Sequence, residues 1–196
     1  MAQPLPLPGA PSRARRRILD SAYELFSRRG IRAAGVDELI DRAGVAKATF
    51  YKHFPSKEDL ALAFLEEREQ RWTREWVEAE ARRRGATPEE RLLAIFDLFA
   101  EWFRRDDFEG CSFINVLLET GDRRDRVGAA SAAHLATVRA ILREFAEEAG
   151  LRDVDEFARS WHILMKGSIV AAAEGDAEAA ALAKAMGREL IARYEA

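Results

Sequence analysis

The sequence predicts an all-α protein, and three observations carry that prediction. Of its 196 residues, 48% are hydrophobic and 33% are charged, which is enough apolar side chain to build a core. Ala, Glu, Arg and Leu recur throughout, whereas Pro and Gly number only 6 and 12, a composition that favours helices. Apolar residues recur with the period of a helix, and glycines follow the periodic stretches. We find no convincing strand and no internal repeat.

The N-terminal segment is predicted to contain an arm and three helices. Residues 1–11 are rich in proline and lack a helical period, so we expect a disordered arm. A first amphipathic helix is predicted over about residues 12–29. Two short helices, over 36–43 and 46–54, flank Gly44.

The remaining helices follow from their start and stop signals. Ser56, Thr87 and Asp153 are expected to cap helix N-termini, because an acidic residue lies three positions after each of them. Glycines that follow helices take the left-handed conformation at no steric cost, and we expect it at Gly30, Gly44, Gly85, Gly150 and Gly175. The later helices are predicted over 56–84, 113–120, 127–149, 153–174 and 176–194, with one more after Thr87 that carries an apolar stripe over 92–103, which makes nine in all.

The charge is distributed unevenly along the chain. Residues 1–54 contain 10 Lys and Arg against 5 Asp and Glu, a net charge of +5, although the whole chain carries −3. A basic N-terminal quarter on an acidic body indicates that the first segment meets a polyanion. A chance distribution over solvated helix faces is the alternative interpretation.

Composition also excludes several classes of protein. Cys111 is the single cysteine, so an internal disulfide framework and a CxxC metal site are impossible. The three histidines lie far apart in the sequence, and we expect neither a metal nor a cofactor. No uncharged stretch reaches the 18 or more apolar residues of a membrane span, and the N-terminus lacks the features of a secretion signal. We therefore expect a cytoplasmic protein with no membrane partner.

Residues 35–54, GVDELIDRAGVAKATFYKHF, have the length and the turn of a helix-turn-helix. Projection of the second helix at about 100° per residue places Phe50 and Phe54 together, facing the core. The opposite face carries Ala48, Thr49 and Lys52, with Lys47 and Tyr51 on one flank and His53 on the other. Small residues let a backbone approach base edges, and Lys, Tyr and His can reach phosphates. An ordinary amphipathic helix pair is the alternative.

Residues 12–65 closely resemble the N-terminal domain of the TetR family of bacterial transcriptional regulators. The motifs that carry the resemblance are Ile18-Leu19-Asp20-Ser21-Ala22, Leu25-Phe26, Arg29-Gly30, Ala43-Gly44-Val45, Lys47-Ala48-Thr49-Phe50-Tyr51, His53-Phe54 and Ser56-Lys57-Glu58-Asp59-Leu60. Gly35 and Ala46 stand where the family usually has a capping hydroxyl, so a phosphate contact is in doubt at both positions. Ile40 replaces a commonly small residue at the helix–helix contact.

The resemblance implies an all-α TetR-type architecture with a helix-turn-helix domain over 12–55 and an effector-binding and dimerisation domain over 56–196. It implies a homodimeric repressor, not an enzyme, that a small apolar or amphipathic ligand releases from a palindromic operator on double-stranded DNA. The alternative is a helical ligand carrier or enzyme without specific DNA binding. A non-specific architectural DNA-binding protein is a further alternative, against which the overall acidic charge argues.

The same resemblance assigns roles to the basic and polar residues of the first domain. In the family's pattern, residues at four of these positions face DNA bases or nearby phosphates: Lys47, Ala48, Thr49 and Lys52. The DNA backbone would be contacted by Tyr51, His53 and Lys57. A basic run that includes Arg13 and Arg17 precedes the first helix and could follow phosphates or enter the minor groove. Simple surface charge explains that run equally well.

The C-terminal region carries no nucleophile–base signature and no phosphate-binding glycine loop. Ligand sites are apolar with a few polar groups, so we predict an effector pocket. Its expected residues are Phe99, Trp102, Phe103, Phe113, Asn115, Leu117, His134, Trp161, His162 and Met165. Each of the aromatic residues can instead be plain core. Residues 110–115 with Glu119 look like a subgroup of the family, and Cys111 is either a small buried residue or a sensor.

The last two predicted helices are rich in small residues, which let helices approach closely. Two copies of this pair could form a four-helix bundle between subunits. The expected interface residues are Ile169, Ala172, Leu182, Ala183, Met186 and Leu190. Packing of the Ala-rich pair within one chain is the alternative.

Overall fold

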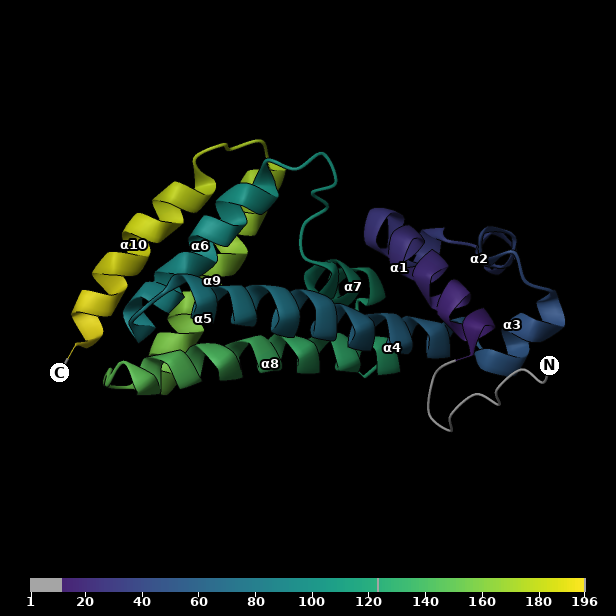
Figure 1. Cartoon of the computed structure of the whole chain (residues 1–196), viewed down its shortest axis with the longest axis horizontal. Coiled ribbons are helices and arrows are strands. Elements are labelled where there is room, and N and C mark those ends of the chain that lie inside the picture. The colour runs from purple at the N-terminus through teal and green to yellow at the C-terminus, as the bar shows by residue number, and fades with distance from the viewer. Residues whose placement is uncertain (1–11, 123, 196) are drawn as a thin grey trace, which may run out of the picture. The chain divides into compact units, whose positions relative to one another are not determined.

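The computed structural model describes residues 12–122 and 124–195, so the predicted arm over 1–11 lies outside the described residues. The described residues form helices and no strand, as predicted (Figure 1). The helices are α1 (Arg13–Ala33), α2 (Val36–Ala43), α3 (Lys47–His53), α4 (Lys57–Arg68), α5 (Ala79–Arg84), α6 (Pro88–Phe103), α7 (Ser112–Thr120), α8 (Arg126–Glu148), α9 (Val154–Ala173) and α10 (Ala179–Tyr194). A π-helical segment, η1 (Glu69–Glu78), joins α4 to α5 without a break. With α4–η1–α5 taken as one helix, the described residues contain the nine helices that the sequence predicts.

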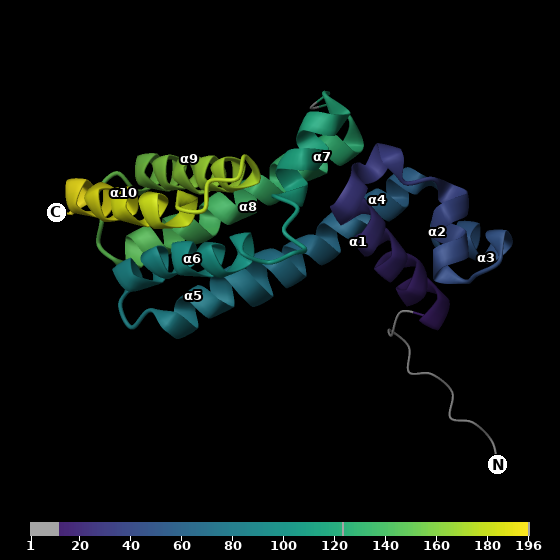
Figure 2. The ribbon, with the colours of Figure 1, turned by 90° about the horizontal axis from the view of Figure 1, so that it is seen from above.

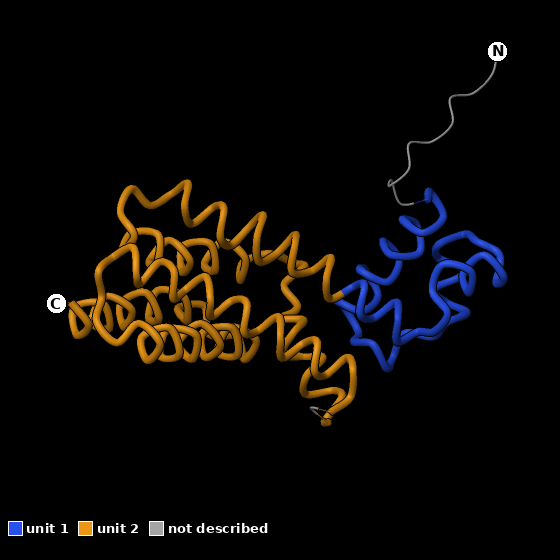
Figure 3. The backbone as a smooth tube through the Cα atoms, turned by 90° about the horizontal axis from the view of Figure 1, so that it is seen from below, with its two compact units in different colours: residues 1–64 blue, residues 65–196 orange. Residues whose placement is uncertain are grey.

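The chain divides into two compact units, residues 1–64 and 65–196 (Figure 3). The division falls within α4, several residues beyond the expected domain boundary at 55. The start of α4 belongs to the first unit because Phe64 packs there. Its ring lies edge-on to Tyr23 and Phe26, with centroids 5.7 and 5.5 Å apart.

In the first unit α1, α2 and α3 contact one another. Regular helix geometry in α1 is interrupted at Gly30 (φ 80°, ψ 169°), close to the predicted end. The turn between α2 and α3 contains Gly44 in the left-handed conformation (φ 59°), as predicted. Neither Gly35 nor Ala46 makes a side-chain capping bond to its helix, which agrees with the loss of two hydroxyls read from the sequence.

Helix starts are mostly as predicted. Ser56 Oγ accepts a hydrogen bond from the Asp59 amide (3.0 Å), and Thr87 forms a reciprocal capping box with Glu90. Asp153 is the exception, because its backbone is left-handed (φ 49°, ψ 44°) and its side chain makes no capping bond. An N-cap requires an extended backbone for its side chain to reach the first turn.

The predicted left-handed conformation at Gly85 is wrong. Its φ is −93°, which any residue adopts, whereas Gly150 and Gly175 do have positive φ. Glycine is required at 85 for a different reason, because a Cβ there would collide with the backbone of Arg91. Close approach of two backbones, and not a special torsion, explains this glycine.

The second unit is a layered helical bundle in which α8, α9, α10 and α6 are consecutive neighbours (Figure 2). α7 packs on α8, and α5 packs on α6. Gly187 on α10 allows close packing, since a Cβ there would lie 2.9 Å from the Trp161 ring and 3.2 Å from that of Phe96. No helix among the described residues has the length and apolar character needed to cross a membrane.

Candidate DNA-binding interface and effector cavity

α3 presents the two faces that the helical projection predicts. Phe50 and Phe54 are buried, with 0% and 3% of their surface exposed. On the remaining surface Thr49 and His53 are half-buried, and the exposed residues are Lys47, Ala48, Tyr51 and Lys52. The exposed surface of α3 is therefore small at the start of the helix and polar, aromatic and basic further along.

Several of the predicted DNA-binding side chains also hold the first unit together. Arg17 donates to the carbonyl of Gly44 in the α2–α3 turn (3.0 Å), and Lys57 Nζ donates to the carbonyl of Arg32 (3.3 Å). His53 Nε2 and Ser12 Oγ lie 3.0 Å apart. Two of these contacts hold the ends of α3 against α1, and the Lys57 contact joins the start of α4 to α1.

The basic run does not precede the first helix. Arg13 and Arg17 lie within α1, whose N-terminus is capped by Ser12 Oγ accepting from the Arg15 amide (3.1 Å). This agrees with the helix predicted over about residues 12–29, and not with a basic run that precedes that helix. The guanidinium of Arg15 lies over the Phe54 ring, 5.0 Å from its centroid, so part of the run packs on the unit itself.

The second unit contains a cavity of about 240 Å³, its open mouth included. Side chains from η1, the start of α7, α8 and α9 line it, namely Trp72, Cys111, Ile114, Leu135, Val138, His162, Met165, Lys166 and Ile169. His162 and Met165 are the members that the effector prediction named. The others were missed as pocket residues, and Ile169 was predicted at the subunit interface instead.

The other predicted pocket residues are not among the lining residues. Phe99, Trp102 and Phe103 form a cluster of rings with Trp72 and Trp76, with neighbouring centroids 5.5 to 6.1 Å apart. Aromatic rings that pack on one another fill space instead of enclosing it, so this stripe is core.

The five remaining residues of the predicted pocket lie outside the cavity wall, and four of them contact other residues of the chain. Trp161 packs on Phe96 and Phe157, and Phe113 stacks on His134 with ring centroids 5.2 Å apart. His134 Nδ1 also contacts the Glu69 carboxylate, and the exposed Asn115 amide donates to the Glu109 carbonyl (3.1 Å). Leu117 is half-buried on α7.

Burial and positive charge determine the electrostatics of the cavity wall. Burial, followed by the positive charges of Lys166 and Arg139, lowers the pKa of His162 to about 3, so its imidazole is neutral at physiological pH. Burial and Arg139 also lower the pKa of Lys166. Burial raises the pKa of the Cys111 thiol, which argues against a reactive thiolate sensor.

Two of the predicted interface residues belong to the interior of the chain. Ile169 lines the cavity and Ala183 is buried, with 5% and 3% exposure. Richness in small residues does not show which helix face turns inward, which is why the sequence misassigned them. Of the other predicted residues, Ala172 and Leu190 are half-buried, and Leu182 and Met186 are more than half exposed.

The exposed apolar surface of α9 was missed. Ile163 and Val170 are 67% and 50% exposed. They stand seven residues apart, two helical turns, and this spacing is the signal that could have identified them. Together with Leu182 and Met186 they place large apolar side chains in solvent on both of the last two helices.

Comparison with known proteins decides the family. Residues 18–64 match the model of bacterial regulatory proteins of the tetR family, and residues 88–186 match the tetracyclin repressor-like C-terminal domain. The chain belongs to the TetR family. SCO4454, a TetR-family regulator from Streptomyces coelicolor, superposes with a TM-score of 0.84 at 27% identity, over 93% of this chain and 96% of that one. The TetR-type regulator sav143 from Streptomyces avermitilis superposes with a TM-score of 0.81 at 29% identity, over 92% and 97%.

Curated relatives of this TetR-family chain are named as transcriptional regulators. The activator FasR from Mycolicibacterium smegmatis is 52% identical over 52 residues, 26% of this chain and 24% of that protein. The repressor KstR from Rhodococcus jostii is 33% identical over 95 residues, 47% of this chain and 42% of that protein. The chain thus covers less than half the length of these relatives. Family and relatives agree that it is a helix-turn-helix transcriptional regulator and not an enzyme.

Proposed function

We propose that this TetR-family regulator is a repressor. As a homodimer it binds a palindromic operator on double-stranded DNA, and a small apolar or amphipathic molecule in the second unit releases it. The observation that carries the proposal is the exposed face of α3, with Lys47, Ala48 and Lys52 opposite the buried Phe50. Two buried phenylalanines anchor this helix to the unit, and its small and basic residues are exposed on the opposite face, an arrangement that suits the major groove.

The α3 surface contains groups suited to both kinds of DNA contact. Ala48 and the Thr49 methyl can pack on a thymine methyl group, while Lys52 and Tyr51 can reach bases or phosphates. Lys52 has no ion-pair or hydrogen-bond partner within the described part of the chain, so its ammonium group is available to an operator. Lys47 lies 3.6 Å from Asp37, an exposed pair that a phosphate can replace.

Exposed apolar side chains on α9 and α10 support the homodimer. Ile163, Val170, Leu182 and Met186 are the side chains that a two-fold pairing of these helices would remove from water. A two-fold dimer presents two α3 helices to half-sites spaced by the helical repeat of DNA. Because the dimer has two-fold symmetry, we expect the DNA sequence that it binds to have the same symmetry and to be a palindrome.

The continuous helix from Lys57 to Arg84 supports ligand control. It begins shortly after α3, and its π-helical part carries Trp72 into the cavity wall. π-helical segments are frequent at functional sites. A ligand that prefers one position of this helix would change the spacing of the two α3 helices, with a typical coupling of about 1–3 kcal/mol.

Selection of bound duplexes from a random DNA library tests the DNA-binding part of the proposal without knowledge of the ligand. We expect enrichment of a palindrome whose half-sites are about one helical turn apart, and binding that weakens steeply as salt rises. Absence of enrichment would remove the DNA-binding role and favour a helical ligand carrier.

Lys52→Ala and Tyr51→Ala are each expected to weaken binding of the selected operator by about 1–3 kcal/mol. Both side chains are exposed on α3, so the fold of the first unit is preserved. Fluorescence anisotropy with a labelled duplex measures the effect, and Lys184→Ala on α10 serves as the matched lysine control. Wild-type affinity in both variants would show that α3 does not read DNA.

Thr49→Ala and Lys57→Ala should separate base reading from backbone contact. The loss of DNA affinity in Thr49→Ala should depend on the operator sequence, because the threonine methyl group on α3 discriminates among base edges. The loss of DNA affinity in Lys57→Ala should be the same for all DNA sequences. In this variant the slope of log affinity against log salt concentration should be smaller by about 1. Titrations of the operator and of two single-base variants, each at several salt concentrations, measure both quantities. Uniform loss at Thr49 would place it on phosphate instead.

A further inference from the structure

We propose that Arg17 is a positioning residue for DNA reading, which fixes the start of α3 by holding the α2–α3 turn. In this role Arg17 acts on DNA through the turn and not through a phosphate contact of its own. The proposal rests on the DNA binding proposed above and adds a residue to it. Three features carry it: the partner of the Arg17 guanidinium, the uncapped start of α3, and the contacts of α1 with the other end of that helix.

The guanidinium of Arg17 binds the backbone of the turn. Its Nη2 donates to the carbonyl of Gly44 (3.0 Å), the residue that ends α2. The last carbonyl groups of a helix lack partners within it, and a cation is favourable beside them because of the helix dipole. A hydrogen bond from an ionised donor is also stronger than a neutral one. One side chain of α1 thus satisfies the end of α2.

The space around Gly44 shows how closely the guanidinium lies on the turn. Gly44 is left-handed (φ 59°), its amide donates to the Asp41 carbonyl (3.0 Å), and the Val45 amide donates to the Ile40 carbonyl (3.3 Å). A Cβ built on Gly44 would collide with Nη2 of Arg17. The first two bonds keep the turn on α2, and the bond from Arg17 ties it to α1.

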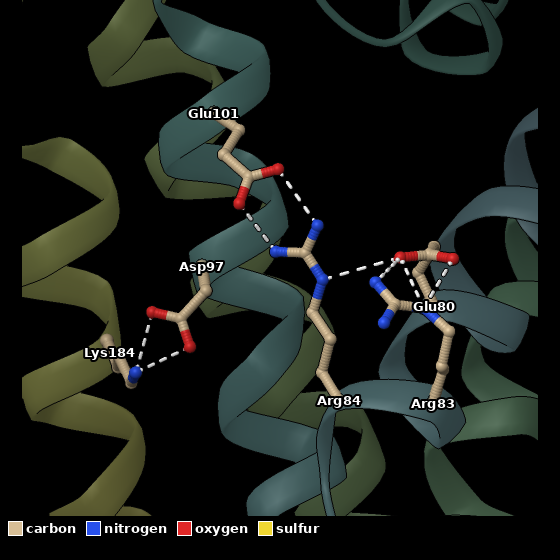
Figure 4. A network of polar contacts seen from close by, with 6 residues as sticks. All are labelled: Glu80, Arg83, Arg84, Asp97, Glu101 and Lys184. Atoms are coloured by element: carbon tan, nitrogen blue, oxygen red, sulfur yellow. Dashed lines mark hydrogen bonds and ion pairs between the residues drawn. The ribbon is translucent and has the colours of Figure 1, made fainter.

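The kind of partner sets Arg17 apart from many other arginines of the chain. Arg84 makes a two-pronged pair with Glu101 (2.6 and 2.9 Å), and Arg83 pairs with Glu80 (Figure 4). Those pairs join side chain to side chain. Within 12–122 and 124–195 Arg17 has no carboxylate partner. Its removal therefore frees a backbone carbonyl of the turn rather than a surface carboxylate.

The start of α3 has little else to hold it. Ala46, at the N-cap position, makes no side-chain capping bond, and the first turn contains no acidic residue. Lys47 lies 3.6 Å from Asp37, but both side chains are largely exposed, and such pairs contribute little. The position of this end consequently depends on the turn that Arg17 holds.

The opposite end of α3 is held by the first turn of α1. Ser12 Oγ lies 3.0 Å from His53 Nε2, and the Arg15 guanidinium lies over the Phe54 ring, 5.0 Å from its centroid. With Arg17 at the start, α1 contacts both ends of the helix. Base contacts require side chains held within roughly 0.5 Å and 10–20° of their productive positions. Loss of one end lets α3 tilt, which misplaces its base contacts first.

Hydrogen exchange tests the positioning role without DNA. In Arg17→Ala, amides of residues 44–50 should exchange at least about threefold faster, because the turn opens locally more often. Arg17→Lys keeps a charged donor and should recover part of the protection. Arg28→Ala is the matched control, since Arg28 is an exposed arginine of α1 that lies 4.0 Å from Glu24 of the same helix. It should exchange like the wild type at 44–50. Circular dichroism verifies that the variants are folded.

Operator binding tests whether the turn acts on DNA reading. Arg17→Ala should weaken binding of the selected operator roughly threefold to thirtyfold. The affinity ratio between that operator and two single-base variants should shrink, because misplaced side chains discriminate less. The slope of log affinity against log salt concentration should stay unchanged, because no phosphate contact is lost. Arg17→Lys should regain part of the affinity and of the discrimination.

Gly44→Asn tests whether Arg17 acts through the turn. Asparagine adopts the left-handed conformation, and its Cβ would displace the guanidinium of Arg17. The single variant should therefore lose affinity as Arg17→Ala does. The double variant should lose little more than either single variant, because both changes break the same contact.

Three results would each overturn the proposal. They are unchanged exchange at 44–50 in Arg17→Ala, a salt slope smaller by about 1 with base discrimination retained, and additive losses in the double variant. The second result would make Arg17 a phosphate contact instead. Failure of the wild type to select any operator would remove the proposed DNA binding, whereas the exchange measurement uses no DNA and still decides whether Arg17 holds the turn.

Discussion

Replacing Leu182 and Met186 together by glutamate is expected to convert the dimer into monomers and to abolish detectable operator binding. Both side chains are more than half exposed on α10, so the charges are tolerated within one chain. In the proposed interface the charges lose water and meet their two-fold copies, at an expected total cost of more than about 4 kcal/mol. That corresponds to a weakening of dimerisation by about a thousandfold or more.

Loss of DNA binding follows from geometry. A monomer presents one α3 helix, and the gain from two linked half-site contacts disappears. Sedimentation velocity at micromolar concentration and anisotropy with the selected operator measure the two effects. Glutamates at Ala181 and Ala192 form the control, because these exposed residues of α10 lie about 100° or more around the helix from the Leu182–Met186 face. A monomeric wild type, or a dimeric Leu182–Met186 variant, would contradict the prediction.

The second unit should lose about 2 kcal/mol of stability between pH 6.5 and pH 5 through His162 alone. The pKa of this imidazole falls from 6.5 to about 3 on folding because of burial, Lys166 and Arg139. Between these two values the unfolded chain binds a proton that the folded chain does not, so stability decreases as pH falls. At 1.36 kcal/mol per pH unit, the loss grows down to about pH 3 and is absent above pH 6.5.

Denaturant unfolding at several pH values measures this loss, and a His162→Met variant isolates it. The four tryptophans all belong to the second unit, so their fluorescence follows its unfolding specifically. Surface carboxylates titrate equally in the wild type and in His162→Met. The difference between the two proteins in how the free energy of unfolding depends on pH is therefore due to His162. His53→Gln in the first unit is the control histidine. Identical profiles for wild type and His162→Met would show that the imidazole is not buried as a neutral group.

Much of this protein is determined by the sequence alone. The helices follow from the apolar period and from local capping groups such as Thr87 with Glu90, because these interactions lie within a few residues. The exposed surface of α3, which we propose to face DNA, follows as well. In a helix of seven residues Phe50 fixes which side is inward, and the opposite side then consists of Ala48 and Lys52.

The cavity and the free helix faces were decided only by tertiary structure. Trp72, Cys111, Val138 and His162 come from segments far apart in the chain, and no local pattern states that they converge. A helical projection gives the angle between two side chains of one helix, but it does not state which neighbouring helix covers them. For that reason Ile169 proved to be cavity wall and Ile163 exposed, although both are apolar residues of α9. Burial of an apolar side chain depends on the partner that covers it, and that partner is supplied by the packing of the whole bundle.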